Sequence, residues 1–148
     1  MNTFTQILYQ IVFSTKNREK TLLEENLERL FKYITGILKN NNCHLYRIGG
    51  VSDHLHIVTH IHPAVSLASL VKDIKVSSNL FIKNSNIFPD FSSWQVGYGA
   101  FTYSIKSKNR LIEYVKNQKQ HHAVKNYKQE LIELLDEHGI PWDEKYLI

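Results

Sequence analysis

Hydrophobic and polar positions change period several times along the chain, and each change predicts a different element. Short runs rich in β-branched and aromatic residues, or runs that alternate in polarity, predict strands. Such runs lie at 6–13, 43–51, 53–61 and 94–105, the last of them broken near Gly97 and Gly99. Apolar residues at helical spacing predict helices at 22–41, 66–83, 108–122 and 127–138.

Short sequence motifs support these element boundaries. Thr21 and Glu24 have the spacing of a capping box, and Pro63 is expected to stop the third strand. The resulting order is βαββαβ followed by two helices. This order predicts an α+β protein of the ferredoxin-like type, an antiparallel sheet with helices on one face and a C-terminal helical extension. No repeat or linker divides the chain, so we expect one domain over residues 1–148.

Composition narrows the class of protein. Hydrophobic residues make up 43% of the chain and charged residues 22%, which excludes disordered, coiled-coil and collagen-like proteins. Cys43 is the single cysteine, so neither an intrachain disulfide nor a multi-cysteine zinc site is possible. The sequence has no apolar run of about 20 residues and no signal-peptide pattern at its start, and we therefore expect a cytoplasmic protein without a membrane anchor.

Charge is unevenly distributed. The net charge is +4, and residues 101–130 carry seven basic side chains against two acidic ones, while the chain beyond Glu130 is acidic. A local excess of positive charge favours contact with a polyanion. The candidate phosphate contacts are Lys106, Lys108, Arg110, Lys116 and Lys119, with Lys72 and Lys83 on the second helix. Ordinary solvated faces are the alternative for these lysines, especially on the second helix.

Two histidines in the third strand are candidate metal ligands. Because strand side chains alternate, His54 and His56 point to one face, about 7 Å apart, while Leu55 points to the other. Two imidazoles at this spacing can share a divalent ion, but two histidines without a ligand role remain the alternative. A histidine-triad nucleotide hydrolase would need a third histidine where the chain has Val58. Asp53 is expected to face away from the pair, as a turn residue or a supporting one.

The helix predicted at 108–122 carries a second candidate group. Tyr114 and Gln118 lie one turn apart, beside the apolar stripe of this helix rather than in its middle. A phenol, with a pKa of about 10, becomes a good nucleophile only when a metal or a base activates it. The amide oxygen of Gln118 is suited to a third metal position. Packing in the core is the alternative role for Tyr114.

Three stretches together resemble the single-tyrosine HUH transposases, which are insertion-sequence enzymes acting on single-stranded DNA, and their REP-associated relatives. These stretches are Asp53–Val58 with its His-Leu-His, Trp94–Phe101, and Tyr114–His122 with its Tyr-x-x-x-Gln. Ile11–Lys16 and His138–Ile140 also fit the family pattern. The resemblance covers nearly the whole chain.

The resemblance implies an activity and a set of roles. His54, His56 and Gln118 would bind Mg²⁺ or Mn²⁺, and Tyr114 would attack single-stranded DNA to form a 5′-phosphotyrosine and free a 3′-hydroxyl. The covalent bond would let another strand rejoin without ATP. The partners implied are hairpin-bearing single-stranded DNA and a second copy of the chain, with active sites shared between subunits in several family members. A hairpin-binding protein without strand transfer and a metal-dependent nucleotide hydrolase are the alternatives.

Overall fold

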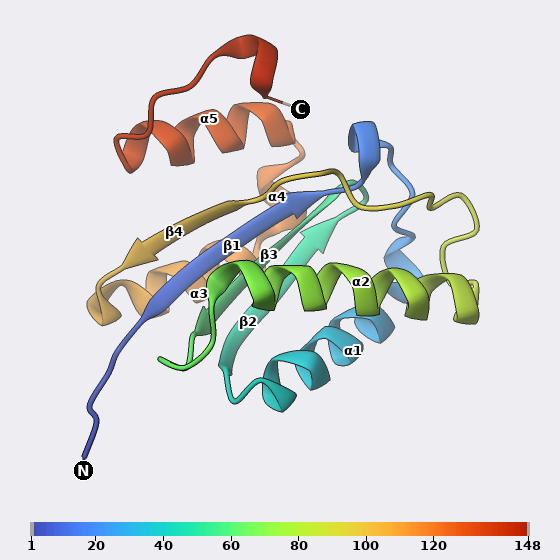
Figure 1. Cartoon of the computed structure of the whole chain (residues 1–148). Coiled ribbons are helices and arrows are strands. Elements are labelled where there is room, and N and C mark those ends of the chain that lie inside the picture. The colour runs from blue at the N-terminus through green and yellow to red at the C-terminus, as the bar shows by residue number, and fades with distance from the viewer. Residues whose placement is uncertain (1, 148) are drawn as a thin grey trace.

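A computed structural model describes residues 2–147 and has a four-stranded antiparallel sheet at its centre (Figure 1). The strands are β1 (Leu8–Ser14), β2 (His44–Val51), β3 (His54–His60) and β4 (Gly99–Tyr103), in the order β2-β3-β1-β4. This order, with both central strands paired on each side, confirms the ferredoxin-like α+β prediction. The register pairs Ser14 with His54 and Val12 with His56, so the start of β3 lies beside the end of β1.

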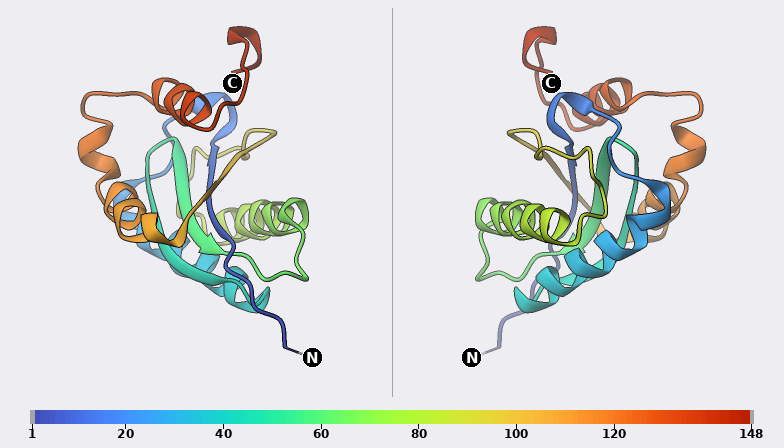
Figure 2. Two further views of the ribbon diagram at one scale, coloured as in Figure 1. Left: turned by 90° about the vertical axis from the view of Figure 1, so that its left-hand side faces the viewer. Right: turned by 90° about the vertical axis from the view of Figure 1, so that its right-hand side faces the viewer.

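One face of the sheet is covered by α1 (Leu27–Asn40) and α2 (Leu67–Ser85). Their apolar stripes pack on the odd-numbered side chains of the central strands, including Leu55 and Ile57, and form the largest core cluster. Figure 2 shows the sheet between α2 on one side and the C-terminal helices on the other. A sheet covered on both faces explains why six of the seven residues of β3 are buried.

The opposite face carries the C-terminal extension, which consists of α3 (Lys108–Lys116), α4 (Gln118–His121) and α5 (Tyr127–Glu137). Two smaller apolar clusters hold it. Leu111 and Val115 of α3 pack on Leu8 and Val58, and Leu134 of α5 packs on Val12 and Phe101. The even-numbered residues of β1 and β3, among them His54 and His56, therefore face the extension.

None of the helices within residues 2–147 is long and apolar enough to cross a membrane.

Three local predictions were wrong. The strand expected at 94–105 is reduced to Gly99–Tyr103, because Trp94 makes only an isolated bridge to Thr15 and donates its indole N–H to Ser78 of α2. The capping box is absent, since α1 is preceded by a 3₁₀ turn whose N-cap is Leu23 and which has no side-chain cap. Glu24 instead forms an ion pair with Lys119 across 2.9 Å.

The third correction concerns the helix expected at 108–122, which is interrupted at Asn117. The backbone of Asn117 (φ −98°, ψ 26°) leaves helical geometry, and α4 begins at Gln118. Gln118 nevertheless remains buried and close to Tyr114, with its Nε2 3.4 Å from the Tyr114 carbonyl oxygen. The break redirects the chain towards α5 without separating these two residues.

A glycine in β2 sets how closely α3 approaches the sheet. A Cβ atom at Gly49 would lie 2.1 Å from the Val115 carbonyl oxygen and 2.8 Å from its Cγ1. We expect Gly49→Ala to lower the free energy of unfolding by about 1–3 kcal/mol, because backbone would have to shift in a close-packed contact. Gly36→Ala is the matched control: that position lies in α1 with open space around it, and alanine there should stabilise by about 0.5–1 kcal/mol. Urea unfolding measures both, and equal midpoints would contradict the packing argument.

Candidate metal centre and nucleophile

The histidine pair lies in the central strand β3, under the C-terminal extension. His54 and His56 are both fully buried, and their ring centroids are 5.2 Å apart. Their neighbours Leu55 and Ile57 face the other side of the sheet and belong to its large core. The strand therefore presents two imidazoles to one enclosed space and fixes them from behind.

Each histidine ring is held through its Nδ1 atom. His54 Nδ1 lies 2.6 Å from Asp53 Oδ1, and His56 Nδ1 lies 2.7 Å from Gln10 Oε1. Gln10 in turn donates from its Nε2 to the hydroxyl of Tyr103. Histidines that bind metals commonly have such a partner on the second ring nitrogen, because it fixes the ring and leaves the other nitrogen free to coordinate. Asp53 was expected to face away from the histidines. It precedes β3, so the alternation of side chains along that strand does not apply to it, and its carboxylate contacts His54.

The Nε2 atoms converge on a carboxylate that comes from α5. Glu130 Oε1 lies 2.8 Å from His56 Nε2, 3.0 Å from His122 Nε2 and 3.2 Å from His54 Nε2. The contact with His54 is close in distance but makes no hydrogen bond, and this buried nitrogen has no hydrogen-bond partner among residues 2–147. In the neutral tautomer whose Nδ1 donates to Asp53, Nε2 carries the ring lone pair and could bind a cation in this space.

These four side chains could hold a divalent metal. One ligand atom from each of His54, His56, His122 and Glu130 lies within 4.8 Å of all the others. Three imidazole nitrogens and a carboxylate oxygen are a donor set that divalent transition metals accept. The unpartnered His54 Nε2 and the Nδ1 supports on both strand histidines fit such a role.

The structure places Gln118 at the edge of this group. Its Oε1 is 3.1 Å from His122 Nε2, and its Nε2 donates to Glu130 Oε2 over 3.3 Å. Its amide oxygen therefore faces one of the candidate ligands, while its nitrogen supports the carboxylate. The four residues predicted from the sequence, His54, His56, Tyr114 and Gln118, therefore lie in one group. Gln118 contacts His122 and Glu130, which lie between it and the two strand histidines.

Tyr114 belongs to the same group through its hydroxyl. The phenol donates a hydrogen bond to Glu130 Oε2, and its ring lies against His121 at a centroid distance of 4.6 Å and His56 at 5.9 Å. Burial, and then the hydrogen bond and charge of Glu130, raise the pKa of Tyr114 well above its usual value. The phenol is therefore neutral in this arrangement and needs help to lose its proton.

The pKa values of Glu130 and of the two strand histidines are shifted by burial and by their contacts with one another. Burial would raise the pKa of Glu130, but the hydrogen bonds from His122 and His56 and the close contact with His54 outweigh it and lower that pKa. Burial lowers the pKa of His56. For His54, the hydrogen bond to Asp53 and the nearby charges of Asp53 and Glu130 outweigh burial and raise the pKa. Glu130 is therefore an ionised carboxylate buried among imidazoles, and a bound cation would replace the imidazole protons that now face it.

Three members of the site were missed in the sequence: Gln10, His122 and Glu130. For Glu130 a signal existed. Tyr127, Glu130 and Leu134 have the spacing of one helix face, and all three are buried in α5. A charged residue inside an apolar stripe is rarely buried without a partner, so its position alone predicts a polar or metal site. His60 and His62 lie outside this group, and their Nδ1 atoms accept hydrogen bonds from the backbone of Ile7 and Ala64.

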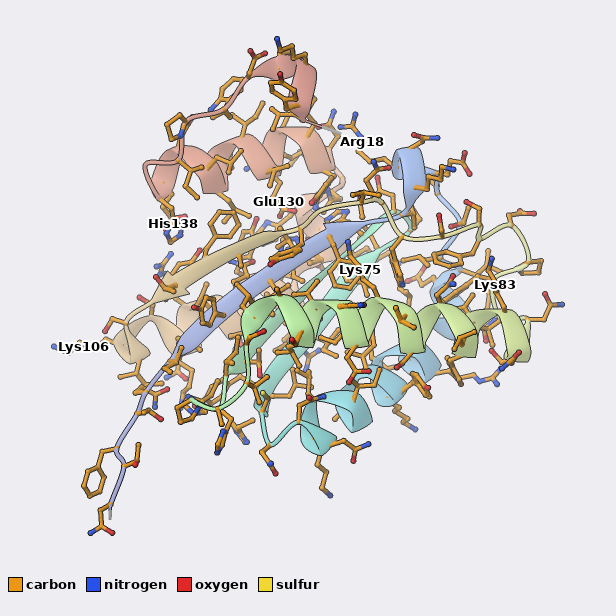
Figure 3. The ribbon with its side chains drawn as sticks, viewed as in Figure 1. Arg18, Lys75, Lys83, Lys106, Glu130 and His138 are labelled. Carbon is orange, nitrogen blue, oxygen red and sulfur yellow. The ribbon has the colours of Figure 1, made fainter. Side chains whose placement is uncertain are left out.

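The candidate DNA contacts do not form one surface. Lys72 and Lys83 lie on α2, across the sheet from the histidines, and Lys106 lies at the opposite end of the molecule from Lys83 (Figure 3). Lys108 is placed over the ring of Tyr46, and Lys116 is exposed. Arg110 lines a small cavity next to Tyr114. Lys119 lines a cavity of 400 Å³ together with Lys20, Lys125 and His122, so it shares a cavity with one of the candidate ligands.

Comparisons with known proteins identify the family. The family described as "Transposase IS200 like" matches residues 3–118, and the chain belongs to it. A protein of Deinococcus radiodurans R1 proposed to be a transposase has the same fold, with a TM-score of 0.62, 20% identity, and coverage of 80% of this chain and 95% of that one. A REP-associated tyrosine transposase bound to a REP hairpin gives a TM-score of 0.60 with 13% identity, over 82% and 72% of the two chains. No curated protein sequence matches the chain.

Proposed function

We propose that this transposase-family protein is a metal-dependent enzyme that cleaves and rejoins single-stranded DNA through Tyr114. One observation carries the proposal: the hydroxyl of Tyr114 is joined by a single carboxylate to the buried imidazoles of His54 and His56. A core tyrosine would not need a buried histidine pair beside it, and a binding module would need neither. The family match supports the same reading.

The proposed roles follow from the positions of the side chains. His54 and His56, with Gln118 or His122 beside them, hold Mg²⁺ or Mn²⁺, which supplies a positive charge for the oxygens of the attacked phosphate. Tyr114 forms a bond from its phenol oxygen to phosphorus and loses its proton, while the bond from phosphorus to the 3′-oxygen breaks and the released oxygen takes up a proton to become a 3′-hydroxyl. Asp53 and Gln10 keep the imidazoles oriented. The phosphotyrosine retains the energy of the broken bond, so a free 3′-hydroxyl can reverse the step.

The proposed substrate is single-stranded DNA that carries a hairpin. One of the structural relatives is described as bound to a REP hairpin, and we extend that substrate class to this chain. We also propose that two copies act together as a homodimer. Tyr114 and the histidine pair of the same chain already meet, so exchange of the tyrosine between subunits would require the extension to move.

A covalent adduct tests the proposed function. Purified protein is mixed with Mn²⁺ and with hairpin-bearing single-stranded oligonucleotides from the DNA that flanks the gene, and the products are separated on a denaturing gel. We expect a slower protein–DNA band that disappears with a chelator. A salt-sensitive shift on a native gel without this band would contradict strand cleavage and favour a hairpin-binding protein instead.

The lysine-lined cavity beside the metal centre makes a further prediction. We expect Lys119→Ala to weaken binding of single-stranded DNA and to reduce the dependence of log K on log salt by about 0.7, the value for one phosphate contact. Lys39→Ala, an exposed lysine at the end of α1, is the control and should leave the slope unchanged. Fluorescence anisotropy over a salt series measures both slopes. Equal slopes in the two variants would remove Lys119 from the DNA-binding surface.

A further inference from the structure

Glu130 occupies the place that a scissile phosphate would need. Its Oε1 faces the three imidazoles, while its Oε2 accepts the hydroxyl of Tyr114. A phosphate attacked by Tyr114 and held by a metal on the histidines would have to bridge the same two groups. A carboxylate and a phosphate both present anionic oxygens to cations and hydrogen-bond donors, so the two groups compete for one position.

The site is also closed around this carboxylate. The side chains of His54, His56 and Glu130 are each at most 1% exposed to solvent. The cavity that touches both Tyr114 and Glu130 has a volume of 130 Å³, whereas sites for small organic ligands are usually about 300–1,000 Å³. A nucleotide cannot enter this arrangement, and four protein ligands around one metal are typical of structural sites rather than open catalytic ones.

The segment that closes the site is a helix with its own N-terminal cap. Asn126 and Gln129 cap the first turn of α5 reciprocally, so the helix satisfies its own N-terminus without the rest of the protein. Ala123 and Val124 before it are exposed. Towards its N-terminus, α5 contacts the sheet mainly through the site, since Tyr127 packs on the ring of His54 at 4.5 Å and Glu130 lies among the imidazoles.

We propose that α5 is a metal-fastened lid, in which His122 and Glu130 bind the metal in the closed state and Glu130 withdraws before DNA reaches Tyr114. This inference rests on the proposed function, because it names what the phosphate must displace. Both ligands lie beyond residue 118, where the family match ends, so the lid is a property of the C-terminal segment of this chain.

Hydrogen–deuterium exchange tests the closed state directly. Exchange at the backbone amides of 127–137 is followed in the full chain with and without Mn²⁺, for the wild type, Glu130→Ala and Glu137→Ala. Glu137 is an exposed residue of the same helix and serves as the matched control. We expect Mn²⁺ to slow exchange of α5 in the wild type and the control but not in Glu130→Ala, and Mn²⁺ affinity to fall at least about tenfold in that variant. Slowing that persists without Glu130 would overturn the lid.

The rate of adduct formation tests the opening. At saturating Mn²⁺, Glu130→Ala should form the covalent adduct at least about tenfold faster than the wild type, because an open state held below about 10% of the population limits the wild type. Loss of the adduct in Glu130→Ala, when the wild type forms it, would overturn the lid and make Glu130 a required part of the reaction. If no form of the protein makes an adduct, the proposed function fails, and the exchange experiment alone decides whether α5 is fastened through Glu130.

Discussion

Tyr114→Phe is expected to abolish the covalent protein–DNA adduct completely while leaving DNA binding within about twofold of the wild type. The proposed bond forms to the phenol oxygen, so no residual pathway should remain when that atom is removed. Only one oxygen is lost, and the ring stays between His56 and His121. A denaturing gel measures the adduct and a native gel measures binding on the same samples.

Folding of this variant needs its own control. Removal of the hydroxyl leaves Glu130 Oε2 with the amide of Gln118 as its remaining donor, which should cost about 1–3 kcal/mol of stability. Tyr103→Phe also removes a partly buried phenol that is hydrogen-bonded to the site, in this case to Gln10, and it should retain the adduct. An adduct that survives Tyr114→Phe would assign the nucleophile elsewhere. Turnover of a small nucleotide that survives it would favour a hydrolase that uses the histidines alone.

The sheet and its helices could be predicted because their signals are local. Strands with alternating or β-branched runs and helices with strong apolar stripes are set by periodicity, and the order of elements then restricts the topology. The interruption at Asn117 had no such signal, because the apolar residues of α3 continue at helical spacing up to the break. The short β4 was overestimated because Trp94, Gln95 and Val96 alternate between apolar and polar as in a strand, yet Trp94 packs against Phe13 and Phe91.

The site was only partly predictable for a different reason. His54 and His56 could be placed on one face because strand geometry is local, and Tyr114 and Gln118 because they are one turn apart. Glu130 reaches His56 across 74 residues of sequence, and no spacing rule gives such a contact. The acidic segment after Glu130 is interpreted from its sequence as structural packing, and that interpretation does not include the burial of the Glu130 carboxylate at the centre of the site.

The second large effect is expected at His56. Replacement of its imidazole removes a candidate ligand from a buried group in which Gln10 and Glu130 both depend on it. In the wild type, Mn²⁺ at a hundredfold excess over its dissociation constant should stabilise the fold by about 2.7 kcal/mol, a rise of roughly 5–10 °C in Tm. In His56→Ala this metal-induced rise should disappear, and the protein without metal should itself be less stable by about 3–5 kcal/mol.

Two further variants separate metal binding from folding. His56→Gln keeps a polar side chain for Gln10 and Glu130 and should fold better than the alanine variant, but it should still lose most of the Mn²⁺-induced rise because an amide is a weaker ligand than an imidazole. His62→Ala removes a histidine outside the group and should keep the full rise. Thermal unfolding with Mn²⁺ or with a chelator measures all four proteins. A rise of the same size in His56→Gln and the wild type would place the metal away from this strand, because a ligand can stabilise the fold only through the contacts that it makes in the folded state.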